Sequence, residues 1–522
     1  MKQALRIGHH RYYREENFRE HLAFVERNVG VIDEITLFAE FSHYGYWDLA
    51  WSAQNAEILR DRIERYRAVG VPSVGINLLA TVGHLNEGWD VLPRAPFPYQ
   101  VNRDGEESRG QLCFMSEDFL DHVAKRYALY AKTGADFIWM DDDIRIEGDG
   151  CFCDGCIERF NRRFGGDRSR RELVALIGSD AEALALWRSI QHEGITRVIR
   201  TVRESVHAVD PRVAVGYMSI DGNCFSDWIE ESGAARCRPG GGFYDERTPI
   251  DIVKKYFRVQ QQISQYPARV TDIQYEYEAF NYQTLNRSAH FSELETTLMQ
   301  MAGCTGVLYN NDIFYDRQSF LDMMAASANK WLTLSHRNEG ARPSGVYCTS
   351  YRTANLLCEL GIPVTAYPDR ASVSAVLGRD WERLTDTEIS RILRGGVFTD
   401  GLGVEILHAR GFGEACGARV QAAHESGMAE RFGSHGLNGD YADYYRDVFM
   451  SFTYYIGNKG NAYEFALSEV PRRSRPSRPS RTSRAGAVCI SASSARDERL
   501  RRTAICSRNR HRPTQSASSF AI

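Results

Sequence analysis

Eight short apolar runs, most of them followed by a stretch with helical periodicity, fill the first 320 residues or so. A period of two residues indicates a strand and a period of 3.6 an amphipathic helix. Eight units of strand then helix favour a closed parallel barrel over an open sheet. We therefore expect an α/β fold in which residues 1–335 form a (β/α)8 TIM barrel, with strands at 5–10, 34–40, 73–79, 136–141, 213–219, 240–244, 270–276 and 306–310.

Polar side chains gather where these expected strands end. In such barrels the carboxyl ends of the strands meet at one face, and this face carries the active site. One polar residue at a strand end is typical of any loop, so only the whole set predicts a site. The set contains His9, Glu40, Asn77, residues 141–143, Asp221, Asp245, Glu276 and residues 310–312.

Three cysteines are crowded in the run Cys151-Phe-Cys-Asp-Gly-Cys156. This spacing places three thiolates on one tight turn, and Cys113 can supply a fourth. Four thiolates satisfy a tetrahedral zinc ion and leave no open position, so we expect a structural Zn2+ held by Cys113, Cys151, Cys153 and Cys156. Buried cysteines without a metal are the alternative.

Three adjacent carboxylates, Asp141, Asp142 and Asp143, follow the expected fourth strand, with Arg145 close behind. Burial and mutual repulsion raise the pKa of a carboxyl group, which suits a general acid. Two other interpretations remain open here. The aspartates are either ligands of a divalent cation or solvated loop acids with Arg145 as their counter-ion.

Two further carboxylates, Glu276 and Glu278, lie on the expected seventh strand, two positions apart and therefore on one face. Carboxylates near strands four and seven lie across the mouth of a barrel. A pair about 5 Å apart is what a retaining glycosidase uses, one as acid/base and one as nucleophile. Nearby aromatic residues can stack on sugar rings, although at this spacing they more often belong to a core.

The remainder of the chain divides by composition. Strand-like and helical runs alternate again over residues 340–420, which predicts a small Rossmann-like α/β domain without a phosphate-binding glycine loop. Residues 421–469 are aromatic-rich and begin a further, β-rich segment. Residues 470–522 are rich in Arg and Ser, and we expect a disordered tail with the character of a frame-shifted end. A functional basic segment is the alternative.

The net charge of −4 hides an asymmetry between +11 for residues 470–522 and −15 for the rest. An acidic body argues against a nucleic-acid binder, because phosphate binding needs a basic surface. No run approaches the roughly 18 apolar residues of a membrane span, and the N-terminus lacks the features of a secretory signal. We therefore expect a cytoplasmic protein with no nucleic-acid or membrane partner.

The cysteines and carboxylates together resemble the layout of glycoside hydrolase family 42, the β-galactosidases, which are clan A barrels. The resemblance covers roughly residues 5–419. It implies that the four cysteines bind zinc, that Asp142 is the acid/base and that Glu276 is the nucleophile, with Asp143 and Glu278 as further catalytic candidates. It also implies a homotrimer, because the small α/β domain is similar to the trimerisation domain of that family.

One position departs from the family pattern. The family has Asn-Glu at the acid/base site, whereas this chain has three aspartates at 141–143, and an aspartate is one methylene shorter. The expected function is hydrolysis of a small β-linked carbohydrate, with substrate contacts from Asp141, Arg145, Glu40, Asn310 and Tyr275. The alternatives are a metal-dependent hydrolase that uses residues 141–143 with His9 or His10, and a catalytically inactive sugar-binding barrel.

Overall fold

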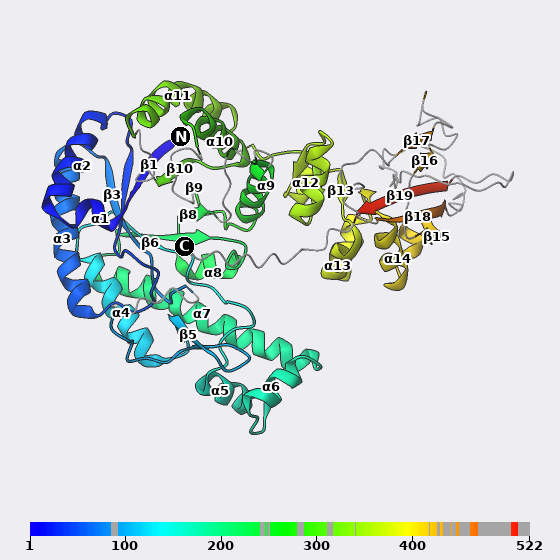
Figure 1. The fold of residues 1–522 in the computed structure, drawn as a ribbon, viewed down its shortest axis with the longest axis horizontal. Helices are drawn as coiled ribbons and strands as arrows, with labels where there is room; N and C mark the ends of the chain where they lie inside the picture. Colours follow the sequence, from blue (N-terminus) through cyan, green and yellow to red (C-terminus); the bar gives the residue numbers. More distant parts are fainter. Residues whose placement is uncertain are drawn as a thin grey trace, which may run out of the picture. The chain divides into compact units, whose positions relative to one another are not determined.

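Eight parallel strands close into a barrel in the first of two units into which the chain divides, residues 1–342 and 343–522 (Figure 1). The structure is a computed structural model. It describes residues 1–84, 92–240, 246, 248, 251–278, 287–310, 317–339, 341–416, 418–424, 429–431, 440, 445–447, 460–467 and 503–509. Within these residues no helix is long and apolar enough to cross a membrane.

The order of strands around the barrel is β1-β10-β9-β8-β7-β6-β3-β2, and every neighbouring pair is parallel. The predicted closed (β/α)8 barrel is therefore confirmed. The barrel strands are β1 (Lys2–Ile7), β2 (Glu34–Phe38), β3 (Ser73–Leu78), β6 (Phe137–Met140), β7 (Ala214–Ser219), β8 (Arg236–Pro239), β9 (Asp272–Tyr277) and β10 (Gly306–Asn310).

The sixth barrel strand is the one that the sequence misplaced. It is β8, Arg236–Pro239, and not residues 240–244, of which 241–244 lie outside the described residues. The cause is visible in the structure. Arg236 and Arg238 both lie inside the barrel, so the strand lacks the apolar run by which the other strands were recognised.

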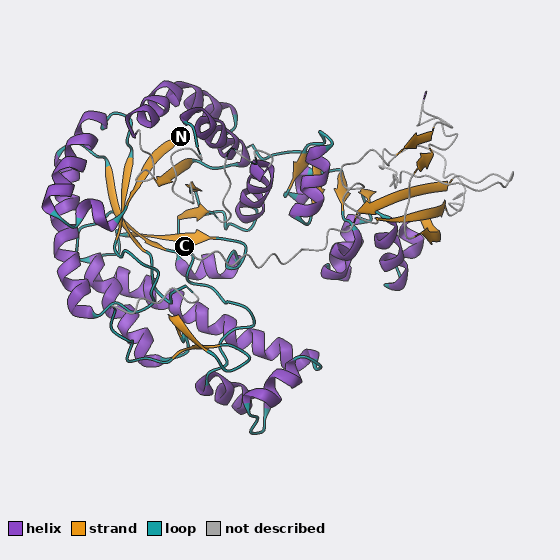
Figure 2. Cartoon of the chain, in the orientation of Figure 1, coloured by secondary structure: helices purple, strands orange, loops and turns teal. Residues whose placement is uncertain are grey.

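Helices surround the barrel, as Figure 2 shows. Many begin at a side-chain cap, such as Ser116 before α4 and Ser288 before α10. The helices are α1 (His9–Tyr12), α2 (Glu15–Asn28), α3 (Leu49–Ala68), α4 (Glu117–Ala131), α5 (Asp154–Phe164), α6 (Arg170–Ile177), α7 (Ala181–Val209), α8 (Ser226–Ser232), α9 (Asp251–Ile263), α10 (Ala289–Ala302) and α11 (Arg317–Arg337). An antiparallel hairpin, β4 (Tyr99–Val101) with β5 (Glu107–Leu112), is inserted between β3 and α4.

The inside of the barrel is charged, whereas most such barrels are filled with branched apolar side chains. Near the amino ends of the strands, Arg236 donates to Glu34 and to Asp272, each over 2.6 Å, and Lys2 donates to Asp272 over 2.6 Å. These groups pair with one another, which offsets the cost of burying each charge. A second charged layer lies above them and forms the candidate site.

The second unit contains a four-stranded parallel sheet in the order β12-β11-β13-β14, with strands Val364–Thr365, Val346–Cys348, Val373–Ala375 and Gly396–Phe398. The predicted small α/β fold is confirmed, although β13 was not foreseen. Its helices are α12 (Tyr351–Glu359), α13 (Asp386–Ile392), α14 (Gly401–Ala409) and α15 (Gly413–Cys416). Trp381, which donates to Thr399 Oγ1 over 2.9 Å, lies in the core beside α14.

Five more strands follow in this unit. Three form an antiparallel sheet in the order β15-β18-β19 (Ala418–His424, Gly460–Leu467 and Thr503–Asn509), and two form a pair, β16 with β17 (Ala429–Arg431 and Tyr445–Asp447). Strand β19 lies inside the segment 470–522, for which the sequence predicts disorder. Residues 503–509 form this strand, and the other residues of the segment lie outside the described ranges, so the predicted disorder of the segment stays a prediction.

Candidate active site

Glu276 lies inside the barrel near the end of β9, between two arginines. Arg6 of β1 donates from Nη1 to Glu276 Oε1 over 2.7 Å, and Nε of Arg238 is 3.8 Å from the same oxygen. The Glu276 side chain is only 9% exposed. Burial raises its pKa above the usual value, and the charges of Glu278 and Asp141 add to the rise, whereas Arg6 and Arg238 oppose it.

The second carboxylate oxygen of Glu276 is not held in this way. Oε2 receives no hydrogen bond from any residue that the structure describes. It faces the backbone of Gly240, where an added Cβ would lie 2.3 Å away from it. A side chain at position 240 would therefore displace this oxygen. One oxygen of Glu276 is held by Arg6, and the other has no hydrogen-bond donor among the described residues.

Glu278 shares the interior face of β9 with Glu276, as the two-residue spacing predicts. It pairs with Nη2 of Arg6, and Asn310 at the end of β10 donates to its Oε1 over 3.0 Å. Arg6 therefore joins both glutamates. Asn310 lies beside the glutamates, in the region where the sequence predicted a substrate contact.

Asp141 lies across the barrel from Glu276 and is linked to it by one side chain. Asn77 of β3 donates to Asp141 Oδ2 over 2.6 Å, and Arg238 Nη2 donates to Oδ1 over 3.1 Å. The same guanidinium reaches Glu276, and Arg238 is fully buried. Both oxygens of Asp141 are thus occupied, so Arg238 connects the end of β6 with the end of β9.

Asp142 follows at the mouth and pairs with two cations. His84 Nε2 is 2.9 Å from its Oδ1, and Arg145 donates from Nη1 to Oδ2 over 3.0 Å. Arg145 also pairs with Glu147, and the rings of His84 and His43 stack at 4.2 Å. Burial acts to raise the pKa of Asp142, but the hydrogen bond and charge of His84, with Arg145, hold it well below its usual range.

Asp143 is directed away from the barrel mouth. Its Oδ2 accepts hydrogen bonds from the backbone N–H groups of Thr81, Val82 and Gly83, at 2.5, 2.7 and 2.7 Å. Burial raises the pKa of this carboxyl to about 6, although the donated hydrogen bonds act against the rise. The sequence predicted that one of the three aspartates has a raised pKa, and this residue is Asp143. Its hydrogen bonds, however, hold the backbone of the loop after β3.

Two of the predicted substrate contacts do not reach the mouth. Tyr275 is fully buried on the outer face of β9, where its hydroxyl donates to Glu295 of α10. Glu40 is fully buried against Arg126 of α4 and accepts from the Leu79 N–H over 2.9 Å. The period of two already places Tyr275 on the face opposite to Glu276, so this correction was available from the sequence.

Several residues of the site carry no sequence signal that we used. Arg6, Arg238 and His84 each contact an expected catalytic carboxylate. Arg6 is separated from Glu276 by 270 positions, and Arg238 from Asp141 by 97. Only the closure of the barrel brings them together.

The four cysteines converge beside the end of β6. Their ligand atoms all lie within 4.8 Å of one another, and Cys113 Sγ is 3.5 Å from Cys153 Sγ and 3.6 Å from Cys156 Sγ. These separations exclude disulfides, which are about 2.05 Å long. Four sulfurs bound to tetrahedral zinc at 2.3 Å lie about 3.8 Å apart. The cluster therefore fits a structural metal such as zinc.

Comparison with known proteins finds similarity in structure only. No family model and no curated protein sequence matches the chain. The β-galactosidase from Bacillus circulans sp. alkalophilus is 11% identical with a TM-score of 0.56, over 83% of this chain and 78% of that one. The β-galactosidase from Rahnella sp. R3 is 11% identical with a TM-score of 0.55, over 90% and 81%.

A third similar structure is an enzyme named for a different sugar. The α-L-fucosidase isoenzyme 2 from Paenibacillus thiaminolyticus is 14% identical with a TM-score of 0.56, over 93% of this chain and 76% of that one. At such identities the likeness concerns the fold alone. The chain has a TIM-barrel fold that resembles those of glycoside hydrolases, among them β-galactosidases and a fucosidase.

Proposed function

We propose that this protein is a glycoside hydrolase that cleaves a β-linked glycoside through two carboxylates. The observation that carries the proposal is the difference in hydrogen bonding between the two carboxylate oxygens of Glu276. One of its oxygens is held by Arg6, while the other oxygen accepts no hydrogen bond from any residue that the structure describes. A nucleophile that must attack one carbon atom from a fixed direction needs this arrangement.

The reaction proceeds in two balanced steps. Glu276 Oε2 attacks the anomeric carbon as the bond from that carbon to the leaving oxygen breaks, and the leaving oxygen takes a proton from the Asp142 side. Water then gives a proton back to the Asp142 side and attacks the same carbon, which releases Glu276 as a carboxylate. Arg6 and Arg238 favour the carboxylate form of Glu276 that begins and ends this cycle.

We assign the transferred proton to the hydrogen-bonded pair of Asp142 and His84. Asp142 alone is a poor proton donor, because His84 and Arg145 hold its pKa low. An imidazole oriented by a carboxylate can hold and release a proton near neutral pH. The pair also compensates for the shorter side chain of aspartate where the similar family has glutamate.

The metal-dependent alternative receives less support from the site. Asp141, Asp142 and Asp143 point to three different sets of partners and do not converge on one point. Among the described residues, the four cysteines are the only cluster of His, Cys, Asp or Glu side chains with metal-binding geometry. We propose that they hold a structural zinc, which supplies no chemistry to the reaction.

The experiment is a panel of aryl β- and α-glycosides assayed with the parent protein and with Glu276→Gln. We expect release of the aryl group from at least one β-glycoside by the parent, and a loss of at least 1,000-fold in kcat in the variant. Turnover that Glu276→Gln leaves unchanged contradicts the assignment of the nucleophile. Sugar binding without any turnover by the folded parent supports an inactive sugar-binding barrel instead.

We further propose that the small α/β domain assembles the chain into a homotrimer. The support is its similarity in sequence layout to the trimerisation domain of family 42 and the parallel sheet β12-β11-β13-β14. Sedimentation equilibrium of the full chain tests this. A mass three times that of the 59.2 kDa chain is expected, and a monomer at micromolar concentration contradicts the proposal.

A further inference from the structure

A pocket of about 400 Å3, with mostly polar residue types in its lining, lies beside the candidate site, between the β4–β5 hairpin and the segment 147–152. Its volume falls near the lower end of small-molecule sites, which span roughly 300–1,000 Å3. The backbone N–H of Phe152 donates to the Val101 carbonyl over 2.7 Å and joins the two walls. The cysteine cluster joins them again, because Cys113 follows the hairpin directly and Cys151 lies within the segment.

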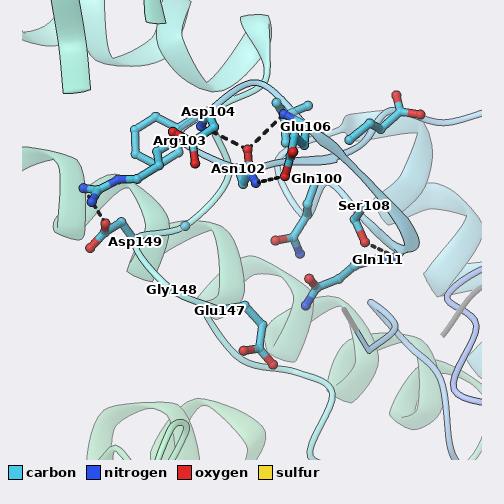
Figure 3. A pocket seen from close by; sticks show the side chains of 14 residues that line it. Gln100, Asn102, Arg103, Asp104, Glu106, Ser108, Gln111, Glu147, Gly148 and Asp149 are labelled. Carbon is cyan, nitrogen blue, oxygen red and sulfur yellow. Dashed lines mark hydrogen bonds and ion pairs between the residues drawn. The ribbon is translucent and has the colours of Figure 1, made fainter. Parts of the chain in front are cut away.

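Most charged groups of the pocket have a partner, either within the lining or just outside it. Arg103 pairs with Asp149 over 2.7 Å, and Asn102 donates to Glu106 over 2.9 Å (Figure 3). Glu107 pairs with Arg94 outside the pocket. The acids at the rim are therefore largely compensated, and a cation is not the ligand that this lining favours.

Of the three amide side chains that line the pocket, only that of Gln111 is left without a partner among the described residues. Gln100 Nε2 donates to the Leu112 carbonyl over 3.2 Å, and Asn102 pairs with Glu106. Gln111 is only 2% exposed, yet no residue that the structure describes hydrogen-bonds to its side chain, and its Nε2 is buried without a partner. Figure 3 shows the amides of Gln100 and Gln111 directed from the hairpin toward the segment that carries Glu147. A buried amide without a partner costs stability, so its presence points to a ligand that completes its hydrogen bonds.

The chemistry of the lining indicates the class of ligand. A carboxamide both donates and accepts, which matches the hydroxyl groups of a saccharide. Paired acids at the rim add further acceptors without a strong net field. An uncharged polyhydroxylated ligand satisfies such a surface better than a phosphate, which the acids repel, or an apolar molecule, which leaves the Gln111 amide unpaired.

Direct contacts connect this pocket to the proton-donating side of the site. Glu147 lines the pocket and pairs with Arg145, and Arg145 donates to Asp142 Oδ2 over 3.0 Å. In a glycosidase the proton donor lies next to the leaving group and the nucleophile lies below the sugar that is attacked. A pocket that continues from Asp142 is therefore on the leaving-group side.

We propose that this pocket is a saccharide subsite that binds the leaving-group sugar of a di- or oligosaccharide substrate, with Gln111 as its central contact. Saccharide binding by the pocket is independent of the reaction, while the leaving-group assignment rests on the proposed glycosidase function. With this subsite, the natural substrate is a glycoside with a sugar aglycone. The cysteine cluster then also supports substrate binding, because it holds both walls of the pocket in place.

Calorimetric titration with lactose, cellobiose and β-1,4-mannobiose tests the subsite. The protein carries Glu276→Gln to prevent turnover, alone and combined with Gln111→Leu. The matched control is Gln265→Leu, which changes an exposed glutamine after the end of α9. We expect at least one disaccharide to bind, its Kd to rise about tenfold with Gln111→Leu as one or two hydrogen bonds are lost, and no change with Gln265→Leu.

The melting temperature separates ligand binding from a structural role. Leu removes an amide that has no partner in the protein, so Gln111→Leu should not lower Tm. Binding that Gln111→Leu leaves unchanged, or no binding by any of the three disaccharides, overturns the subsite. Absence of aryl glycoside turnover in the parent, with Gln111-dependent binding retained, overturns only the proposed catalytic function.

Discussion

The two sides of the barrel mouth are built in different ways. Glu276 and its partners Arg6 and Arg238 all lie on barrel strands, so the register of the sheet fixes their positions. Asp142 and its partners His84 and Arg145 lie in loops after β6 and β3. The side of the proposed nucleophile, called here the nucleophile side, therefore depends on the barrel. The side of the proposed proton donor, called here the proton side, depends on loop contacts and on the cysteine cluster beside it.

The largest effect is expected from a substitution in the cysteine cluster, which should destabilise the whole proton side. Cys156→Ser removes one of the four proposed zinc ligands, and structural zinc contributes roughly 10 kcal/mol in small zinc peptides. We expect loss of bound zinc, cleavage of the β4–β5 hairpin by protease, and a fall in Tm. Zinc content and limited proteolysis are measured against Cys358→Ser, a cysteine of the second unit. An unchanged metal content and hairpin contradict the structural zinc.

A second change separates the two sides by chemistry. Asp142→Asn removes the carboxylate that orients His84, and general acid–base catalysis contributes about 100- to 10,000-fold. A poor leaving group must receive a proton from the general acid before it can depart, whereas a good leaving group departs without it. We expect kcat/KM to fall by that amount for a methyl glycoside and much less for a dinitrophenyl glycoside. Equal losses on both substrates argue against a role for Asp142 in proton transfer, and exposed Asp118→Asn serves as the control.

The nucleophile side is tested by adding one carbon atom. In Gly240→Ala the new Cβ would lie 2.3 Å from Glu276 Oε2, so the carboxylate must move. A misplacement of about 1 Å costs roughly 100-fold in rate, and good and poor leaving groups should be affected alike. Gly30→Ala, where nothing lies within 4 Å of the new atom, is the matched control. Full activity in Gly240→Ala refutes the assigned role of Oε2.

The last prediction concerns the pH dependence of stability. The pKa of Asp143 is raised from 3.8 to about 6, so folding favours its protonated form. Its contribution to stability is present below pH 4 and is lost as the pH rises through 6, which amounts to about 3 kcal/mol. We expect urea unfolding to show that, as the pH rises over this range, the free energy of unfolding of Asp143→Asn increases relative to that of the parent. If instead the parent becomes more stable relative to the variant as the pH rises, the pKa of Asp143 is lowered by folding. The backbone hydrogen bonds then outweigh burial.

The sequence by itself determined the elements, the closed barrel and the meeting of the four cysteines. Seven of the eight strands follow from local periodicity, which depends only on neighbouring residues. Three of the cysteines lie within six positions, so one turn brings them together, and the resemblance to family 42 implied Cys113 as the fourth ligand. The glutamates at 276 and 278 share a face for the same local reason.

Only the tertiary structure decided which partner each charged group has. The three aspartates at 141–143 look alike in sequence, but they bind Arg238, His84 and the backbone of residues 81–83, respectively. The sixth strand escaped notice because its arginines face charged partners inside the barrel, where charge can replace apolar character. Such pairings join residues about 60 to 270 positions apart, and no local pattern encodes them, because barrel closure alone brings them within hydrogen-bonding distance.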